Sequence, residues 1–330
     1  MTPNSPFHLS FLLFDGFSNM ILACAMEPLR AARDLSGKRL FSWQIATMDG
    51  LPVVSSSRVS LSADLPADRI GATDALVVVT GYGARDHMSR SVTQFIRKTS
   101  RGLPLTVGLD TGAWLVAGAG LLTGRRATIH WMEVEAFAET FLDVETRTAP
   151  WEQDGNFVTC GGAGGVLDWA LALIRDHGGE ALSFDVANMF GRIAATSDRS
   201  HGTAAYPPDV PRMMDLGLPP ALQRAITAMR QTADAPLSLP EIAEIAAVSL
   251  RTLDRMFMAT LGVPAGGYYR QIRLAHARAL AMDTRLTLAE IAARTGFVSA
   301  ATLARAYRNQ YGETVGASRA RQPQRSHPFA

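Results

Sequence analysis

The sequence predicts an α/β unit with a mostly parallel sheet, followed by an all-helical unit. In the first 196 residues, short apolar runs of strand length alternate with helix-like segments, a pattern typical of a parallel sheet with helices on both faces. After residue 217 the pattern is helical throughout, and two segments repeat each other at a spacing of about 50 residues. We therefore expect two domains of different fold class.

The expected elements of the α/β unit alternate in regular order. Strands are expected at Phe7–Phe14, Phe41–Met48, Ala75–Val79, Leu105–Leu109 and Phe157–Cys160, and helices at Asn19–Arg33, Asp86–Lys98, Val166–Arg175 and Glu180–Ala195. The glycine run at 161–165 lacks the Lys and Ser/Thr ending of a phosphate-binding loop, so we interpret it as a closely packed strand–helix turn. This order predicts a flavodoxin-like sandwich.

Length and composition narrow the class of protein. The chain has 330 residues, 47% of them hydrophobic, which is enough to bury large cores and excludes global disorder. No apolar run reaches the roughly 18–20 residues of a membrane span, and the first residues lack the basic region of a signal peptide. We therefore expect a cytoplasmic, nucleoid-associated protein without membrane contact. Cys24 and Cys160 lack metal-ligand spacing, so we interpret them as buried thiols and expect no metal.

The two parts of the chain differ in charge. Residues 215–330 contain 14 Arg, no Lys and 8 acidic residues, a formal charge of +6, whereas residues 1–214 carry −4. A basic part beside a mildly acidic one fits a nucleic-acid-binding module joined to another domain. A polar, proline-rich stretch separates them. It predicts an α/β domain at 1–196, a linker at 197–217, a helical domain at 218–321 and a tail at 322–330.

The repeat in the helical domain has the form helix, turn, helix. Its shared positions are Leu239, Ile242, Ser249, Leu253, Arg255, Phe257 and Gly262 in the first copy, and Leu288, Ile291, Ser299, Leu303, Arg305, Tyr307 and Gly312 in the second. In each copy the serine is placed to cap the second helix, and apolar residues at helical spacing follow it. A connecting helix is expected at about Tyr268–Met282.

This pattern, together with Phe297 after Gly296 and with Arg273 in the connecting helix, resembles the DNA-binding domain of the AraC/XylS family over residues 216–321. The resemblance implies two recognition helices in successive major-groove segments of double-stranded promoter DNA. It implies base contacts for the outward residues Arg251, Asp254, Arg255, Ala300, Ala301, Thr302 and Arg305.

Each of these assignments has an alternative. An arginine can contact phosphate instead of a base, and Asp254 disfavours DNA unless it orients an arginine or accepts a hydrogen bond from cytosine. The sequence also departs from the family pattern, with Ala247 where a turn glycine is common. Val315 and Ser318 replace the usual residues near the end, so we regard the final helix as doubtful.

A second motif, Thr-Val-Gly-Leu-Asp-Thr-Gly-Ala-Trp at 106–114, indicates a strand, a sharp turn and a helix start. Such an elbow presents one side chain, here Asp110, at the carboxyl edge of the sheet. With Glu27 in the first helix and His130 about 20 residues after the elbow, the region resembles the class I glutamine amidotransferase-like, PfpI-type domain of the GlxA-like regulators over residues 7–195. The related enzymes have cysteine at the elbow. Because a carboxylate cannot perform thiol acyl transfer, we expect no catalytic residue.

The interpretation that remains for this domain is a ligand sensor. Open α/β sheets bind ligands at the carboxyl ends of their strands. The candidate ligand-binding residues are Glu27, Asp110, Thr111, Trp114, His130 and Trp131. Carboxylates with indole faces suit a cation. The elbow is most similar to that of regulators of carnitine, glycine betaine and arginine use, which implies a small effector such as a quaternary amine or an amino acid.

Several of these residues also have structural interpretations. Trp43 and Trp151 are more simply core or rim residues than walls of a ligand cage, and His130 can be a hydrogen-bonded structural histidine. Asp110 can cap the helix that follows it, which is compatible with ligand binding.

These features predict a ligand-responsive, sequence-specific transcriptional regulator, not an enzyme and without a cofactor. By resemblance it is an activator that works with RNA polymerase and forms a homodimer. One alternative is an amidase or hydrolase of the PfpI-like fold, which would lose turnover with Asp110→Ala. The other is a ligand-independent DNA-binding protein, whose footprint would not respond to metabolites.

Overall fold

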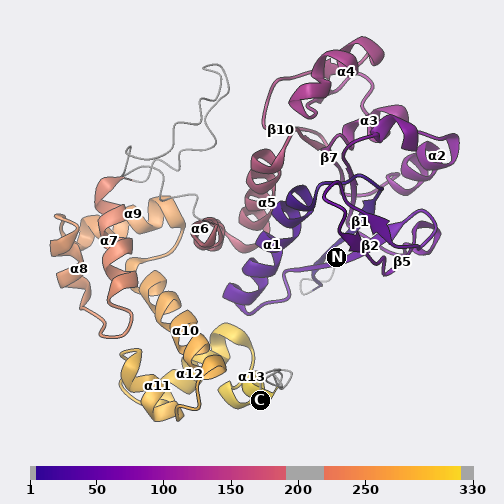
Figure 1. Cartoon of the computed structure of the whole chain (residues 1–330). Coiled ribbons are helices and arrows are strands. Elements are labelled where there is room, and N and C mark those ends of the chain that lie inside the picture. The colour runs from indigo at the N-terminus through magenta and orange to yellow at the C-terminus, as the bar shows by residue number, and fades with distance from the viewer. Residues whose placement is uncertain (1–4, 191–218, 321–330) are drawn as a thin grey trace. The chain divides into compact units, whose positions relative to one another are not determined.

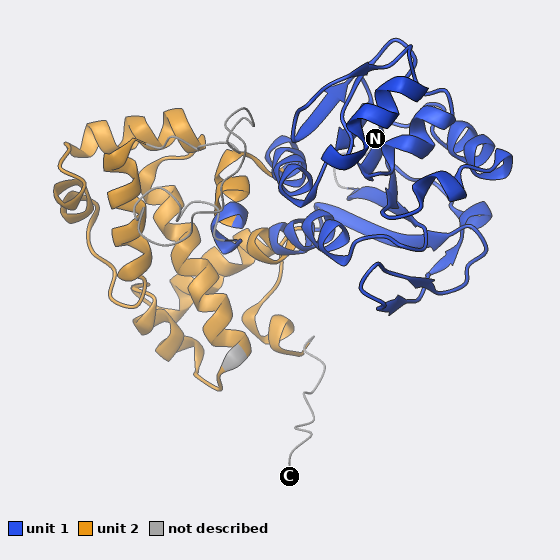
Figure 2. Cartoon of the chain, turned by 45° about the horizontal axis from the view of Figure 1, so that its top comes forward, with its two compact units in different colours: residues 1–32, 39–177, 186–215 blue, residues 33–38, 178–185, 216–330 orange. Residues whose placement is uncertain are grey.

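The computed structural model describes residues 5–190 and 219–320 (Figure 1). The expected linker at 197–217, the tail at 322–330 and the end of the helix expected at Glu180–Ala195 lie outside these residues. The chain forms two compact units, shown in two colours in Figure 2. One is the α/β unit. The other is the helical unit, with which residues 33–38 and 178–185 also group.

The sheet of the α/β unit has seven strands in the order β10-β11-β7-β6-β1-β2-β5. The strands are β1 (Phe7–Leu13), β2 (Phe41–Thr47), β5 (Leu65–Pro66), β6 (Ala75–Thr80), β7 (Leu105–Asp110), β10 (Trp151–Asp154) and β11 (Phe157–Cys160). All neighbours are parallel except β10 and β11, which are antiparallel. The predicted, mostly parallel sheet is therefore confirmed, and an antiparallel edge strand is added to it.

Helices and short hairpins complete this unit. They are α1 (Asn19–Ser36), α2 (Arg90–Thr99), α3 (Ala113–Gly118), α4 (Val134–Thr140), α5 (Ala163–Gly178), the 3-10 turns η1 (Ala67–Arg69), η2 (Ala84–His87) and η3 (Trp131–Glu133), and the strand pairs β3 (Val53–Val54) with β4 (Ser60–Leu61) and β8 (Arg126–Ala127) with β9 (Glu145–Thr146). The next helix is α6 (Glu180–Met189), and its residues 180–185 group with the helical unit. Figure 1 shows α1 and α5 on one side of the sheet and α2 and α3 on the other, so both faces are covered.

The core lies on both faces of β1, β6 and β7, whose residues are almost all buried. Leu12 and Val78 pack in one cluster with Ile96 of α2 and Trp114 of α3. Because alternate side chains of a strand point to opposite faces, the residues between them fill the other side. Of the two cysteines, Cys160 is buried and Cys24 is half-buried.

Two expected helices begin at different places from those predicted. The helix expected at Asp86–Lys98 is split into η2 and α2, because Ser89 caps α2 by accepting a hydrogen bond from the Val92 N–H at 3.3 Å. The helix expected from Val166 begins earlier, because residues 163–165 of the glycine run already belong to α5, and a Cβ at Gly165 would overlap the carbonyl group of Pro150. The glycines thus serve close packing, as expected from their sequence.

The helical unit consists of α7 (Pro220–Gln231), α8 (Leu239–Ile245), α9 (Leu250–Leu261), α10 (Ala265–Asp283), α11 (Leu288–Arg294), α12 (Ala300–Tyr311) and α13 (Val315–Ala320). The final helix, doubtful from sequence, does form. Its Ser318 accepts a hydrogen bond from the Tyr307 hydroxyl at 2.8 Å and donates one to Glu313 at 2.7 Å. Among the described helices, none combines the length and the apolarity that a membrane span requires.

Candidate functional sites

The helical unit contains the same three-helix arrangement twice, as α7-α8-α9 and α10-α11-α12. Both short helices begin with a capping box, formed by Ser238 with Glu241 and by Thr287 with Glu290. The helices that follow are capped by Ser249 and Ser299, each of which accepts from a backbone N–H at 3.2 Å. The sequence repeat thus corresponds to two helix-turn-helix units of matching local structure.

An arginine from the preceding helix holds the turn of each unit. Arg224 of α7 donates to the carbonyl of Ala246 at 2.7 Å. Arg273 of α10 donates to the carbonyl of Thr295 at 2.7 Å and also to that of Gly296. These carbonyls lie where α8 and α11 end, so the guanidinium groups satisfy acceptors that the helices leave free. The repeat therefore extends to the preceding helices, which sequence reasoning missed in α7.

The two turns differ in length. Ala247 and Gly296 occupy equivalent positions, with φ of 57° and 67°. The second turn has one extra residue, Val298, which directly precedes the cap residue Ser299 of α12 and is 97% exposed. Alanine in the left-handed region is strained, so the first turn forms at a cost in stability that glycine avoids in the second.

The second helix of each unit has one buried and one exposed face. Leu253, Phe257 and Leu261 of α9 are buried, as are Leu303, Tyr307 and Tyr311 of α12. The predicted base-reading residues Arg251, Asp254, Arg255, Ala301, Thr302 and Arg305 are exposed, and Ala300 is half-buried. The structure therefore places six of the seven predicted residues on accessible helix surfaces.

Asp254 has a structural partner within the unit. Its carboxylate accepts a hydrogen bond from the backbone N–H of Ala265, the first residue of α10, at 2.9 Å. The carboxylate thereby fixes the start of the connecting helix. The position equivalent to Asp254 in α12 is Ala304, so the second unit lacks this contact. This geometry favours a positioning role for Asp254 over base contact.

In the α/β unit, the elbow has the sharp geometry expected from its sequence. Asp110 ends β7 with φ of 61°, in the left-handed region. The next residue, Thr111, donates to the carbonyl of Gly81 at 2.7 Å and shares a hydrogen bond of 2.8 Å with Thr80. A Cβ at Gly112 would overlap the carbonyl of Val78, so the turn needs glycine there. The elbow is thus bonded to the neighbouring strand β6.

Burial changes the charge expected at the elbow. Asp110 is 8% exposed, and desolvation raises its pKa to about 7. Its backbone carbonyl accepts from the N–H of His130 at 3.2 Å, which brings the histidine segment to the elbow. The His130 imidazole accepts from the Met132 N–H at 3.4 Å, and burial lowers its pKa. Near neutral pH the elbow carboxyl is therefore only partly ionised, and the His130 imidazole favours the neutral form.

Glu27 has a partner within its own helix. It lies in the middle of α1, about 12 Å along the axis from the helix start at Asn19. Its carboxylate forms an ion pair with Arg30 at 2.7 Å in the same helix. Among the described residues, no contact joins the Glu27 carboxylate to Asp110, so a shared site for these two side chains stays a prediction.

A different carboxylate and indole do meet at the carboxyl edge of the sheet. Trp114, which is 1% exposed, donates its indole N–H to Glu133 at 3.1 Å. Arg85 donates to the same carboxylate oxygen at 3.2 Å, and its guanidinium carbon lies 4.2 Å from the Trp114 ring centroid. We name Arg85, Trp114 and Glu133 the edge triad. Sequence reasoning identified Trp114 and missed the other two, because no local pattern marks them.

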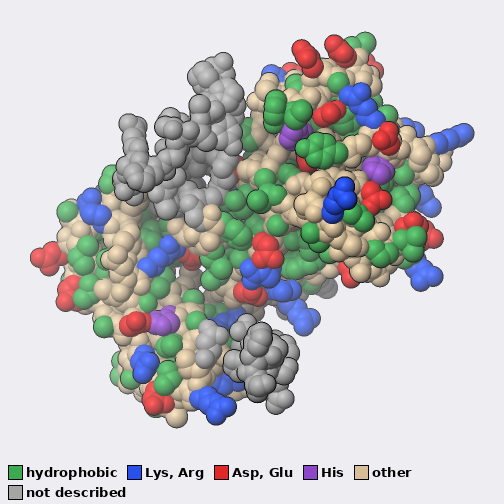
Figure 3. All heavy atoms as spheres, in the orientation of Figure 1, with side chains coloured by type: hydrophobic (Ala, Val, Ile, Leu, Met, Phe, Trp, Pro, Cys, Tyr) green, Lys and Arg blue, Asp and Glu red, His purple; other side chains and the backbone are tan. Residues whose placement is uncertain are grey.

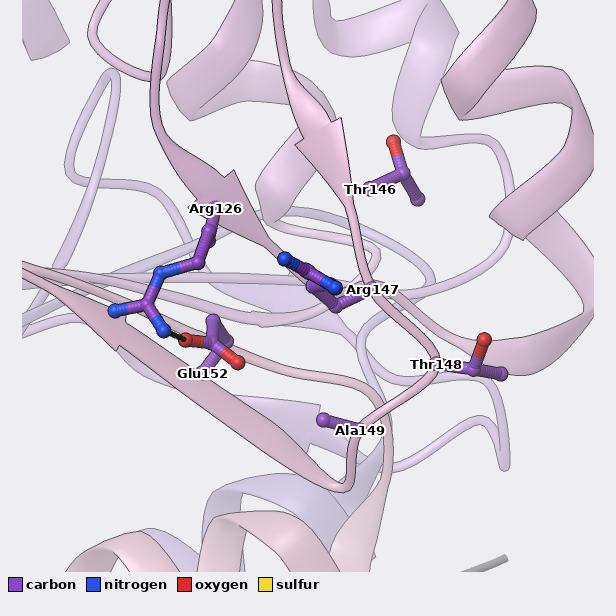
Figure 4. Close-up of a pocket in the computed structure, with 6 residues that line it drawn as sticks. All are labelled: Arg126, Thr146, Arg147, Thr148, Ala149 and Glu152. Carbon is purple, nitrogen blue, oxygen red and sulfur yellow. Dashed lines mark ion pairs between the residues drawn. The ribbon is translucent and has the colours of Figure 1, made fainter. Parts of the chain in front are cut away.

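A polar hollow lies elsewhere in the α/β unit. Its volume is about 570 Å³, and it is lined by Arg126, Thr146, Arg147, Thr148, Ala149 and Glu152 (Figure 4). Its two arginines are paired with acidic neighbours, Arg126 with Glu152 at 3.0 Å and Arg147 with Glu145. The charges in this open, polar hollow are thus already balanced. It contains none of the elbow residues.

Comparison with known proteins agrees with both units. Residues 9–176 match the DJ-1/PfpI family and residues 242–321 match a helix-turn-helix domain. The chain is 33% identical over 310 residues to the HTH-type transcriptional regulator GbdR of Pseudomonas aeruginosa, covering 93% of this chain and 83% of that protein. It is also 33% identical over 317 residues to the regulator GlxA of Rhizobium meliloti, covering 95% of each.

A solved structure of an AraC family transcriptional regulator from Pseudomonas putida supports the fold of the α/β unit. Its TM-score is 0.50 at 24% identity, and the match covers 56% of this chain and all of that one. Relatives that match nearly the whole chain are regulators, which identifies this chain as a regulator rather than an enzyme. It belongs to the transcriptional regulators that combine an N-terminal DJ-1/PfpI domain with a C-terminal AraC-type helix-turn-helix domain.

Proposed function

We propose that this regulator responds to a small cationic or zwitterionic nitrogen metabolite and activates genes for the use of that compound. The α/β unit would bind the metabolite and form the homodimer, and the helical unit would bind promoter DNA and act with RNA polymerase. In related enzymes the elbow positions a nucleophilic cysteine. Here it carries the buried Asp110, whose carboxyl group can bind a ligand but cannot act as a thiol nucleophile. The metabolite would act through its differential affinity for two states of the protein.

One observation carries the DNA-binding part of the proposal. The helical unit presents two equivalent helices, α9 and α12, each capped by serine and each with its outer face exposed. We assign base reading to Arg251 and Arg255 in α9 and to Ala301, Thr302 and Arg305 in α12. Arginine can bind guanine through two hydrogen bonds, whereas alanine and the threonine methyl group contact the thymine methyl group. The first helix therefore reads by hydrogen bonds and the second more by apolar contact.

The experiment compares specific with random DNA. A binding site is first selected by the full chain from a library of random duplexes. Arg255→Ala and Arg305→Ala should each weaken binding to that site by about 1–3 kcal/mol, while binding to random duplex changes much less. Arg101→Ala, which removes the same charge from an exposed position of the α/β unit, is the matched control and should bind both duplexes like the wild type.

Equal losses on specific and random DNA would place these arginines on phosphate and refute the base-reading assignment. The metabolite part of the proposal is tested separately, by footprinting a selected site with and without choline, glycine betaine, carnitine and arginine. A footprint that responds to none of them would favour a ligand-independent DNA-binding protein.

A further inference from the structure

The edge triad joins three segments that follow three different strands of the α/β unit. Arg85 lies in η2 after β6, Trp114 lies in the first turn of α3 after β7, and Glu133 ends η3 after β8. One carboxylate oxygen of Glu133 accepts both the indole N–H at 3.1 Å and the Arg85 guanidinium at 3.2 Å. The guanidinium also lies over the indole ring at 4.2 Å. The protein therefore holds one of its own cations against an aromatic face and a carboxylate.

Burial differs sharply between these three side chains. Trp114 is 1% exposed and packs edge-on against Phe137 at a centroid distance of 5.2 Å, so its position is fixed by the core. The Arg85 and Glu133 side chains remain 53% and 35% exposed. A half-exposed ion pair is screened by water and salt, and the arginine side chain gains entropy on release. The indole thus has a fixed position to which Glu133 is hydrogen-bonded, whereas the guanidinium over it is only weakly held.

Two residues close to the triad in sequence are exposed aromatics. Tyr82, three residues before Arg85, is 80% exposed, and Trp131, two residues before Glu133, is 73% exposed. Figure 3 shows exposed hydrophobic side chains on the drawn face of the α/β unit. Aromatic faces and a carboxylate are the groups that recognise guanidinium and methylated ammonium ions. Both the guanidinium of Arg85 and these exposed aromatic residues therefore indicate an organic cation as the ligand.

We propose that Trp114 and Glu133 form a receptor for a small organic cation, and that Arg85 is an internal occupant which this cation displaces. The proposal deepens the proposed function, since it rests on the α/β unit sensing such a metabolite. Because the ligand binds only the fraction of molecules in which Arg85 has left the indole, Arg85 lowers the apparent affinity by that fraction. Removal of Arg85 should therefore strengthen binding, unlike removal of an ordinary ligand-contacting residue.

The test is titration calorimetry of the full chain with two probes, choline and methylguanidinium, which distinguish a methylated ammonium head from a guanidinium. Arg85→Ala should bind the better probe about tenfold more tightly than the wild type. Glu133→Gln should lose that binding. Arg90→Ala removes the same charge from an exposed position five residues away and should bind like the wild type.

Arg85→Ala with unchanged or weaker affinity for both probes, or Glu133→Gln with wild-type affinity, would overturn the receptor. The tryptophan emission spectrum verifies that each variant is folded. If DNA binding responds to a metabolite but neither probe binds wild type or Arg85→Ala, the receptor is refuted and the proposed regulation stands. If the probes bind as expected without changing DNA binding, the receptor is supported and the proposed regulation fails.

Discussion

Replacement of Asp110 by asparagine should stabilise the α/β unit, and the gain should grow with pH. Burial raises the pKa of Asp110 from 3.8 to about 7. In this range the folded state holds a proton that the unfolded state has lost, so the free energy of unfolding falls as pH rises from about 4 and levels off above about 7. Asparagine has the same shape, carries no charge, and tolerates the φ of 61° at this position.

The size of the effect follows from the pKa difference. Each pKa unit corresponds to about 1.4 kcal/mol, so the ionised carboxyl costs on the order of 4 kcal/mol above pH 7. At pH 5 the cost is about 1.7 kcal/mol, because it accumulates only over the roughly 1.2 pH units between the pKa of the unfolded state, 3.8, and pH 5. Between pH 5 and pH 8 the wild type should therefore lose about 2.5 kcal/mol more stability than Asp110→Asn.

The assay is urea unfolding of both proteins at pH 5, 6, 7 and 8, followed by tryptophan fluorescence. All five tryptophans lie between residues 43 and 169, so this signal reports on the α/β unit alone. Parallel stability profiles for the two proteins across this range would refute the reasoning, because they would show that Asp110 has an ordinary pKa in the folded state.

Three further predictions concern the free energy of unfolding of the helical unit, which is measured by circular dichroism. Ala247→Gly should stabilise it by up to about 1 kcal/mol, because relief of left-handed strain exceeds the entropic cost of glycine, whereas Gly296→Ala should destabilise it by at least as much. Arg224→Ala and Arg273→Ala should each cost about 1.5–3 kcal/mol through loss of charged hydrogen bonds, and no loss of stability would contradict the observed turn contacts. Asp254→Ala should lower the free energy of unfolding by about 1 kcal/mol, whereas Asp254→Asn should retain most of it and select the same DNA sequence as the wild type. A changed sequence preference with Asp254→Asn would instead show that Asp254 contacts a base.

Hydrophobic periodicity was sufficient to predict the architecture. The buried strands β1, β6 and β7 are mostly apolar, and such strands alternating with helices indicate a sheet covered on both faces. The short strand pairs were missed, because two-residue strands such as β3 and β4 carry no periodic signal. The final helix was doubtful, because its stability depends on the contact between Tyr307 and Ser318, which no local pattern reveals.

In the candidate site, too, features within one short segment could be predicted from the sequence, whereas contacts between distant segments could not. The elbow at Asp110 could be predicted, since one short segment specifies its strand, turn and helix. Arg85 and Glu133 are 48 residues apart and meet only through the fold, since η2 follows β6 of the seven-stranded sheet whereas η3 follows β8 of a separate two-stranded pair. For Glu27 the described contact is local, an ion pair with Arg30 in the same helix, and its part in ligand binding stays a prediction.

The central claim is that two equivalent helices read DNA together, and hydroxyl-radical footprinting of the full chain on its selected site tests it most directly. The account predicts two protected stretches, about one helical turn of DNA apart, on the same face of the duplex. Arg255→Ala should weaken one stretch first and Arg305→Ala the other. A single protected stretch that both variants weaken equally would contradict the account.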